Sequence, residues 1–443
     1  MNIQKFVDTV YKQASLSKAD DFQIVSDYVA REVLNLFEGK VDSQSVSESF
    51  SLKLSVRLNG KIGSVVCQNL DEKIIPELID TALENAMLAG EGEEDFFYDG
   101  KGEYQKAKPY EPLLEKWKKL DRLAFLKAVE KEAFALDKRV HQVQKVSIGE
   151  TKTQKIMQNS LGLNLNEERL WAWASLSLSA KEGEVIQNGF KSVTFEKEEE
   201  FSPTYLAKHA VEDAVSRLSE IEISSAQVPV VFENKTFADL LEFLADIVSA
   251  KEVQSKKSRF EGKIGQKVAA DIVTILDAPL LLGGYSSTSF DGEGYPCYDK
   301  EVLKNGVLQT YLHSLKTAQK DKVSPTGNGA GYDGEVCVTN FYLKPQNLSK
   351  EALLAEVGNG VYIDRLQGLH AGYNIVSGDF SFGAKGFLLK NGSIDQPLKQ
   401  FTVSGNYYQM LQNIRLIGDD LEFKTSGFGS PCVCVDGLMI GGK

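Results

Sequence analysis

The chain has 443 residues, more than one compact hydrophobic core usually supports, so we expect at least two domains. Its 42% hydrophobic and 25% charged residues are typical of a soluble globular protein. The net charge of −12 argues against non-specific binding to nucleic acid, and no apolar run is long enough to span a membrane. The start MNIQKFVDTVYKQ has no apolar signal core, and five cysteines form no disulfide framework, so we expect reduced thiols in the cytoplasm.

The first block of the chain alternates helix and strand signals. Apolar residues at helical spacing predict a helix over residues 3–15, and looser alternation predicts a strand over Asp21–Phe37. Strict alternation over Ser51–Arg57, followed by Asn59-Gly60, predicts a β-hairpin. A helix from about Asp71 to Leu88 closes the block, with an apolar stripe along one face.

The second block repeats that order after a helix expected over Lys119–Leu136. Strands are expected over Val140–Ile148, Thr151–Asn159, Leu170–Ala180 and Val185–Phe195. A helix then begins at Pro203, with Ser202 as its N-cap residue.

The two blocks are similar in sequence. SLKLSVRLNGKIGSV resembles SLSLSAKEGEVIQNG, and the helix around TALENAM resembles the helix around HAVEDAV. We therefore interpret residues 1–225 as an N-terminal α+β domain with an internal repeat, each repeat a β-meander followed by a helix.

Composition changes after residue 225, where 26 of the 37 glycines lie. Dense glycine among short apolar runs is typical of bent strands and tight turns. We expect a buried strand at Val228–Glu233, a helix in LLEFLADIVSA, a strand in VAADIVTIL, and hairpin turns at Asn305-Gly306 and Asn391-Gly392. Residues 226–443 are therefore predicted to form a β-rich, barrel-like or sandwich-like domain, which makes the fold class α+β with two domains.

General catalytic signatures are missing from the sequence. There is no nucleophile elbow, Walker loop or dinucleotide fingerprint, and the four histidines are too far apart in sequence for a helical metal pair. Cys432 and Cys434 would share one face of a strand, where buried structural thiols are commoner than metal or redox sites.

Three polar, glycine-rich stretches stand out: Ser324–Gly329, Gly368–Phe387 and Asn413–Leu421. The second has five glycines in 20 residues. Sharply bent strands explain this composition. A groove whose backbone amides and carbonyls pair with an extended peptide explains it too.

These stretches, and LHAGYNIVSGDFSFGAKGFLLKNG above all, resemble the C-terminal domain of the TldD/PmbA family, also called modulators of DNA gyrase, and are closer to its PmbA (TldE) branch. The resemblance covers the whole chain. It implies a cytoplasmic dimeric assembly of two homologous subunits that cleaves unfolded peptides and is linked to peptide maturation. It also implies that a TldD-type partner carries zinc on an H-E-x-x-x-H helix.

An ungapped comparison anchored on Phe260, Gly262 and Gly265 places that zinc motif on residues 241–246. Glu242 is retained, but the histidines are replaced by Leu241 and Asp246. The resemblance therefore implies no zinc, and no cofactor, in this chain. Glu242 and Asp246, at i and i+4 on one helix face, either hold Mg²⁺ or Ca²⁺ weakly or form a solvated polar face.

Residues of the glycine-rich stretch are the candidates for peptide binding: His370, Asn374, Ser377, Gly378 and Asp379. His370 lies in the motif specific to the family, where it contacts substrate or partner, or stabilises a turn.

The main functional hypothesis is a non-catalytic PmbA/TldE-type subunit that pairs with a TldD-type partner and holds unfolded peptides, as a homo- or hetero-oligomer. One alternative is a peptidase in its own right, with a non-standard metal site at Glu242 and Asp246. Another alternative is a protein-interaction role of the gyrase-modulator kind. Its only support is the acidic N-terminal half, residues 1–227, which holds 38 acidic and 29 basic residues.

Overall fold

The computed structural model describes residues 3–90, 96–331 and 334–442, and they divide into two compact units. Unit 1 comprises residues 1–103, 111–215 and 293–295, and unit 2 comprises residues 104–110, 216–292 and 296–443. Both units combine helices with sheet, fully antiparallel in unit 1 and mainly antiparallel in unit 2, so the predicted α+β fold class is confirmed.

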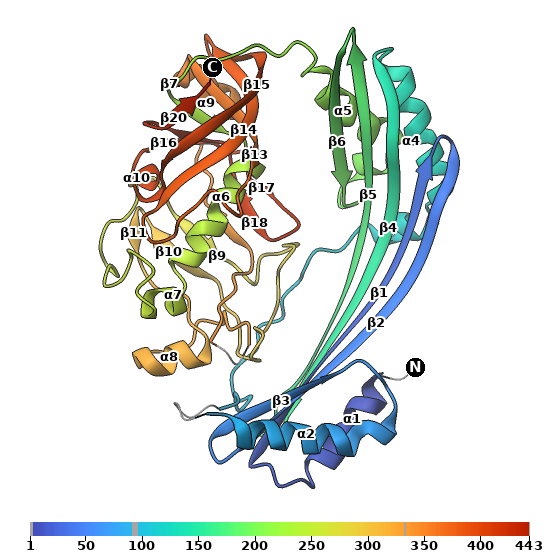
Figure 1. The fold of residues 1–443 in the computed structure, drawn as a ribbon, viewed down its shortest axis with the longest axis vertical. Coiled ribbons are helices and arrows are strands. Elements are labelled where there is room, and N and C mark those ends of the chain that lie inside the picture. The colour runs from blue at the N-terminus through green and yellow to red at the C-terminus, as the bar shows by residue number, and fades with distance from the viewer. Residues whose placement is uncertain (1–2, 91–95, 332–333, 443) are drawn as a thin grey trace. The chain divides into compact units, whose positions relative to one another are not determined.

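Unit 1 is built on one six-stranded sheet with the order β3-β2-β1-β4-β5-β6, in which every neighbouring pair is antiparallel. Figure 1 shows β1, β2, β4 and β5 as long curved ribbons. The strands are β1 (Asp21–Phe37), β2 (Lys40–Leu58), β3 (Lys61–Cys67), β4 (Val140–Asn159), β5 (Asn164–Glu182) and β6 (Val185–Val193). The helices are α1 (Ile3–Ala14), α2 (Ile75–Leu88), α3 (Leu114–Lys119), α4 (Arg122–Leu136) and α5 (Pro203–Val215).

The strands of unit 1 are longer than the sequence pattern predicts. The two strands expected at 140–148 and 151–159 are one strand, β4, so that division was wrong. Gly149 lies between them without breaking the strand. A Cβ at Gly149 would lie 2.7 Å from the carbonyl oxygen of Glu32 and 3.0 Å from the Trp173 ring, so glycine here permits a close approach.

The sheet of unit 1 consists of two similar halves, β1–β3 and β4–β6, which meet where β1 pairs with β4. On β3, a Cβ at Gly63 would lie 2.1 Å from the backbone nitrogen of Ala86. On β6, a Cβ at Gly189 would lie 2.1 Å from the carbonyl oxygen of Ala210 and 2.8 Å from the backbone nitrogen of Ala214. Each half therefore packs a glycine of its third strand against alanines of the helix that follows, α2 or α5.

By their contacts, Gly63 and Gly189 are structurally equivalent positions of the two halves. The sequence similarity instead aligns Gly63 with residue 187, two positions earlier. Val56 pairs with Gly63, three residue pairs from the β2–β3 turn. Leu178 pairs with Gly189, five residue pairs from the β5–β6 turn. The β5–β6 hairpin is therefore longer by two pairs, and this shifts the equivalent positions.

Unit 2 contains an eight-stranded sheet of order β16-β19-β8-β13-β14-β15-β20-β7 and a six-stranded sheet of order β11-β10-β9-β12-β18-β17. Its strands are β7 (Ala226–Gln227), β8 (Val230–Phe232), β9 (Ile275–Asp277), β10 (Lys300–Lys304), β11 (Val307–Leu308), β12 (Phe341–Leu343), β13 (Gly360–Gln367), β14 (Asp379–Lys390), β15 (Ser393–Asn406), β16 (Ile414–Ile417), β17 (Glu422–Phe423), β18 (Phe428–Ser430), β19 (Val433–Val435) and β20 (Met439–Gly441). Its helices are α6 (Asn234–Ile247), α7 (Ala250–Gln254), α8 (Leu315–Asp321), α9 (Lys350–Val357) and α10 (Tyr407–Gln412).

The turns predicted in unit 2 are present. Asn305-Gly306 joins β10 to β11, and Asn391-Gly392 joins β14 to β15, all four residues having positive φ. The strand expected in VAADIVTIL is shorter, because only Ile275–Asp277 pairs into a sheet. Helix α6 contacts β12, β13, β17 and β18, and its apolar side chains enter the core of unit 2.

Candidate functional site

Helix α6 presents one apolar and one polar face. Its N-terminus is capped by Glu233, whose carboxylate accepts hydrogen bonds from the N–H groups of Lys235 (2.9 Å) and Thr236 (3.3 Å). Leu241 is 0% exposed and belongs to the core together with Leu244. Position 241, which the resemblance equates with a zinc-binding histidine, therefore points into the hydrophobic core.

The opposite face of α6 carries the two carboxylates singled out in the sequence, Glu242 and Asp246, and both are exposed. The pKa of Glu242 is raised by partial burial and then by the charge of Asp246. The pKa of Asp246 is raised by partial burial and then by the charges of Glu252 and Glu335. Negative charge therefore accumulates on this face of the helix.

A lysine from a distant hairpin partly neutralises that charge. The ammonium group of Lys424, in the turn between β17 and β18, forms an ion pair with Asp239 and lies 3.9 Å from Oε1 of Glu242. The backbone of Lys424 is fixed, because its N–H donates to the carbonyl of Phe428 (2.8 Å) and its carbonyl accepts from Gly427 (2.9 Å). Partial burial lowers the pKa of Lys424.

These residues do not fit a zinc ion. Zinc sites in proteins use imidazole or thiolate ligands, usually four groups in a tetrahedron. Position 241 is apolar and buried, and the ammonium group of Lys424 beside Glu242 would repel a cation. Within residues 3–90, 96–331 and 334–442, no group of three or more His, Cys, Asp or Glu side chains converges in a way that could hold a metal.

The glycine-rich loop between β13 and β14 brings four of the predicted peptide-binding residues together. Oδ1 of Asn374 accepts hydrogen bonds from the N–H groups of Val376 (2.9 Å) and Ser377 (3.0 Å). The N–H of Gly378 donates to the carbonyl of Asn374 (2.7 Å), and the N–H of Asp379 donates to Oγ of Ser377 (3.2 Å). These polar groups therefore stabilise the loop itself. His370, the fifth of the predicted peptide-binding residues, is exposed near the start of the loop.

Helix α10 and the residue before it fix the end of the loop. The amide Nδ2 of Asn406 donates to the carboxylate of Asp379 (2.8 Å) and to the carbonyl of Ser377 (2.8 Å). Hydrogen bonds from Asn406 and Ser377 lower the pKa of Asp379. Gly378 has φ +77°, and a Cβ there would lie 2.4 Å from the Tyr408 ring, so only glycine fits.

Aromatic contacts join the loop to the polar face of α6. The rings of Phe243 and Tyr373 lie 4.1 Å apart between centroids, and Phe243 stacks on Phe382 at 5.6 Å. The hydroxyl of Tyr373 is buried and makes no hydrogen bond within the described part of the chain. Burial raises the pKa of Tyr373, and Tyr408 and Asp246 add to the effect. Glu242, Asp246 and the loop therefore belong to one surface of unit 2.

Sequence reasoning missed three contributors to this surface: Phe243, Tyr373 and Lys424. Phe243 and Tyr373 were within stretches already singled out, so their aromatic character was the available signal. No sequence pattern marked Lys424 as part of this surface, because Lys424 reaches α6 only through the pairing of β18 with β12.

Asn328, from the stretch Ser324–Gly329, belongs to a buried polar network around Asp277. Asp277 is 0% exposed and accepts hydrogen bonds from Lys300 (2.9 Å), Asn328 (2.7 Å) and both the N–H (2.8 Å) and the hydroxyl (2.7 Å) of Thr339. This network ties together four segments far apart in the sequence. A structural role for Asn328 follows.

The cysteines of the PCVCVDGL strand are buried, as their apolar context indicated. Cys432 and Cys434 pack in one cluster with Leu353 and Tyr362. Burial raises the pKa of both thiols, that of Cys434 to about 11. Thiols with raised pKa are poor nucleophiles and metal ligands at neutral pH.

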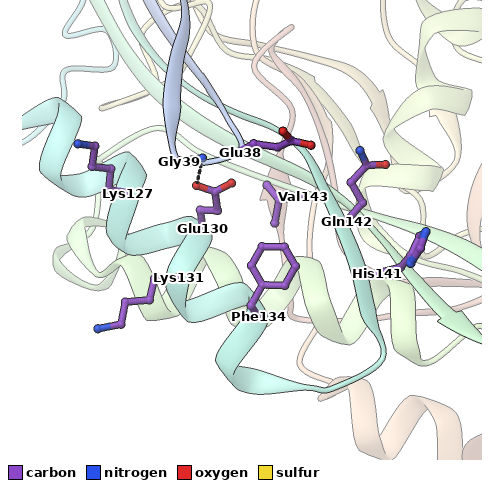
Figure 2. Close-up of a pocket in the computed structure, with 9 residues that line it drawn as sticks. All are labelled: Glu38, Gly39, Lys127, Glu130, Lys131, Phe134, His141, Gln142 and Val143. Carbon is purple, nitrogen blue, oxygen red and sulfur yellow. Dashed lines mark hydrogen bonds between the residues drawn. The ribbon is translucent and has the colours of Figure 1, made fainter.

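Unit 1 holds a hollow of about 590 Å³ beside helix α4 and the β1–β2 hairpin. In Figure 2, the carboxylate of Glu130 on α4 reaches the tip of the β1–β2 hairpin, where it accepts the N–H of Gly39 (2.8 Å). Lys127 and Lys131 point away from Phe134, whose ring lies below the hairpin. The hollow therefore surrounds the anchor of the hairpin, and its charged groups do not converge on one point.

Comparisons with known proteins place the chain in a family. Residues 112–218 match the model of the PmbA/TldA metallopeptidase central domain, and residues 225–442 match that of the C-terminal domain. A metalloprotease PmbA homolog from Haemophilus influenzae is 31% identical over 319 residues, with 71% of this chain and 68% of the relative covered. The metalloprotease PmbA of Escherichia coli O157:H7 is 24% identical over 96% of this chain and 93% of its own length.

Solved structures agree over the full length. A candidate modulator of a DNA gyrase from Thermotoga maritima superposes with a TM-score of 0.89 at 32% identity, covering 99% of this chain and 100% of that chain. TldE from Thermococcus kodakarensis shares the fold, with a TM-score of 0.85 at 20% identity over 99% and 100% of the two chains. No helix in the described part of the chain is both long and apolar enough to cross a membrane. On these matches, the chain belongs to the PmbA/TldD metallopeptidase family.

Proposed function

We propose that this chain is a PmbA/TldE-type subunit that binds unfolded peptides without cleaving them, and that a TldD-type partner supplies the zinc and the hydrolysis. The proposal includes a cytoplasmic location and a role in proteolysis or peptide maturation. The observation that carries it is the chemistry of α6. A metallopeptidase needs a metal-bound water, and here one ligand position is a core leucine and the retained Glu242 lies beside Lys424.

The surface formed by α6 and the glycine-rich loop is the proposed peptide site. Phe243 and Tyr373 offer aromatic area, Glu242 and Asp246 offer acceptors for peptide N–H or cationic groups, and His370 is exposed at one end. Asn374, Ser377, Gly378 and Asp379 keep the loop in shape, so in this proposal they position the site.

Co-expression with a TldD-type chain from the same genome tests the proposal. We expect the two chains to co-purify, and the pair to cleave an unfolded peptide faster than the partner alone. His370→Ala should weaken peptide binding by this chain without lowering its melting temperature, whereas His141→Ala, an exposed histidine of unit 1, should change neither. Failure of the chains to associate, or equal cleavage with and without this chain, would rule the subunit role out.

A peptidase acting alone is the competing function, and the raised pKa values of Glu242 and Asp246 favour it because raised carboxyl pKa values recur at catalytic sites. Glu242→Gln separates the two functions. If the pure chain hydrolyses a peptide after addition of Mg²⁺, Mn²⁺ or Zn²⁺ and Glu242→Gln abolishes that hydrolysis, the chain is an enzyme. The subunit proposal predicts no hydrolysis by either protein.

A further inference from the structure

An open apolar groove lies between α1 and α2 in unit 1. Its volume is about 640 Å³, and it is lined by both helices, by the turn after α1 and by the end of β2. Leu16 and Met87 line it and are 87% and 64% exposed. Ile79, Leu83 and Met87 follow one another at intervals of four residues, so they form one apolar stripe along α2. In Figure 1, α1 and α2 lie at the opposite end of the long strands from α4 and α5.

The other half of unit 1 contains the same helix surface in a covered form. Ala82 of α2 is equivalent to Ala210 of α5, because the carbonyl of each meets the glycine of the third strand, Gly63 or Gly189. The stripe of α2 therefore has its counterpart in three residues of α5: Ala207, Val211 and Val215. The first two of these are only 0% and 5% exposed, so this surface of α5 is closed to solvent.

Helix α4 covers the surface of α5. The two helices pack together, and Oγ1 of Thr204 on α5 donates a hydrogen bond to the carboxylate of Glu132 on α4 (3.3 Å). The residue of α2 equivalent to Thr204 is Pro76, which lines the groove. In the first half of the unit, α1 has 12 residues where α4 has 15, and it touches α2 at few points. The internal repeat therefore places a helix on this surface in one half and leaves the surface open in the other.

The charges beside the groove favour a basic helix. Asp80 and Glu84 of α2 line the groove, are exposed, and form no ion pair within the residues that the structure describes. The equivalent residues of α5, Lys208 and Glu212, form an ion pair with each other (3.8 Å). Two like charges four residues apart repel each other, so cations placed beside Asp80 and Glu84 would be stabilising. Lys18, in the turn after α1, is the one basic residue among those that line the groove.

We propose that the groove between α1 and α2 binds an amphipathic helix of another protein, which lays its apolar side on the stripe of α2 and places Lys or Arg side chains beside Asp80 and Glu84. Covering Leu16 and Met87 removes apolar surface from water, and this supplies the driving force. The same two carboxylates disfavour an anionic membrane surface. The inference does not depend on the proposed peptide-binding role, because the groove lies in unit 1 and the proposed peptide site lies in unit 2.

A peptide that copies α4 is the probe, because α4 covers the equivalent surface within this chain. The peptide comprises residues 122–136, carries fluorescein, and contains Glu132→Lys, which places a cation at the position where α4 contacts α5. Titration with the full-length chain should give a saturable rise in fluorescence anisotropy at micromolar concentration. The peptide with the native Glu132 should bind about threefold more weakly, since it lacks the exposed ion pair.

Variants of the groove locate the binding. Met87→Glu places a carboxylate in the apolar stripe, so the affinity for the peptide should fall about tenfold or more. Leu88→Glu is the matched control, because Leu88 is 82% exposed and does not line the groove, and it should bind like the wild type. Asp80→Lys combined with Glu84→Lys should reverse the preference between the two peptides. Equal affinity of the wild type and Met87→Glu, or no saturable binding of either peptide, would overturn the proposal.

Two other occupants of the groove are separated by further measurements. If Met87→Glu, and not Leu88→Glu, converts a dimer of the pure chain into a monomer in light scattering, a second copy occupies the groove. If the peptide binds the pure chain but not its complex with a TldD-type chain, that subunit occupies the groove. Either result would overturn the assignment to a helix of another protein.

Discussion

Units 1 and 2 reach stability by different means, and the difference explains which parts of the chain the sequence predicts. Unit 1 repeats one arrangement of long alternating strands and a helix that packs on a glycine. Its elements can therefore be predicted from residues that are close together in the sequence. Unit 2 joins short strands through buried polar groups, and Asp277 alone binds three residues from distant segments. Each prediction below perturbs one side of this comparison.

The largest effect is expected at Asp277 in unit 2. Asp277→Ala would leave the ammonium group of Lys300, with a side chain that is 6% exposed, buried without its counter-ion. Breaking a buried ion pair on one side costs about 3–5 kcal/mol, so the free energy of unfolding of unit 2 should fall by that amount. Urea denaturation measures it. Asp271→Ala, whose carboxylate pairs with Lys267 at a 77% exposed site, should change it by less than about 0.5 kcal/mol.

The next largest effect is expected at the matched glycines of unit 1. Gly63→Val and Gly189→Val would each push a side chain into the backbone of α2 or α5. Overpacking of this kind costs about 1–3 kcal/mol or more, and the two variants should lose similar amounts because the contacts are equivalent. Thermal unfolding checks this. Gly90→Val meets no atom within 4 Å and is the control. A large loss at one site alone would show that the two halves are not equivalent.

A smaller, pH-dependent effect is expected at His313 in unit 2. His313 is 4% exposed with Nδ1 buried and without a hydrogen bond in the described chain, and burial lowers its pKa below the ordinary value. The unfolded chain therefore binds the proton first as the pH falls. Stability contributed by the neutral imidazole is complete above about pH 6.5 and is lost below it. His313→Gln should flatten the stability profile between pH 7 and pH 5, and an unchanged profile would contradict the assignment.

The smallest effects are expected at two polar contacts that the halves of unit 1 share. Nδ2 of Asn85 on α2 donates to the carbonyl of Ser64 (2.9 Å), and the carboxylate of Asp213 on α5 accepts the N–H of Phe190 (2.9 Å). Asn85→Ala and Asp213→Ala should each cost about 0.5–1.5 kcal/mol, the usual net value of one hydrogen bond. Urea midpoints that differ widely between the two variants would weaken the equivalence of the halves.

Local patterns explain what could be predicted in unit 1. Leu52, Leu54 and Val56 alternate and are all buried, so the hairpin at Asn59-Gly60 was evident. The first half of β2 was missed, because Lys40–Ser49 has no apolar alternation and is held only by pairing with β1. The expected strands ended at Ile148 and resumed at Thr151, whereas the structure has one strand in which Gly149 permits a close contact.

Only part of the candidate site in unit 2 could be predicted from the sequence. The sequence identified α6 and the loop around Asn374, because composition and resemblance marked both. It could not predict that Lys424 reaches Asp239 and Glu242, since that contact depends on how β17 and β18 pack beside α6. The sequence also could not predict that Asn374 and Ser377 form their hydrogen bonds within the loop itself.

The most direct test of the proposed function is the zinc content of the purified full-length chain, compared with that of a Leu241→His/Asp246→His variant. We predict less than one zinc in ten chains for the wild type. We predict no gain for a folded variant, because position 241 faces the core and Lys424 stays beside Glu242. One zinc per wild-type chain, lost on Glu242→Gln, would contradict the account.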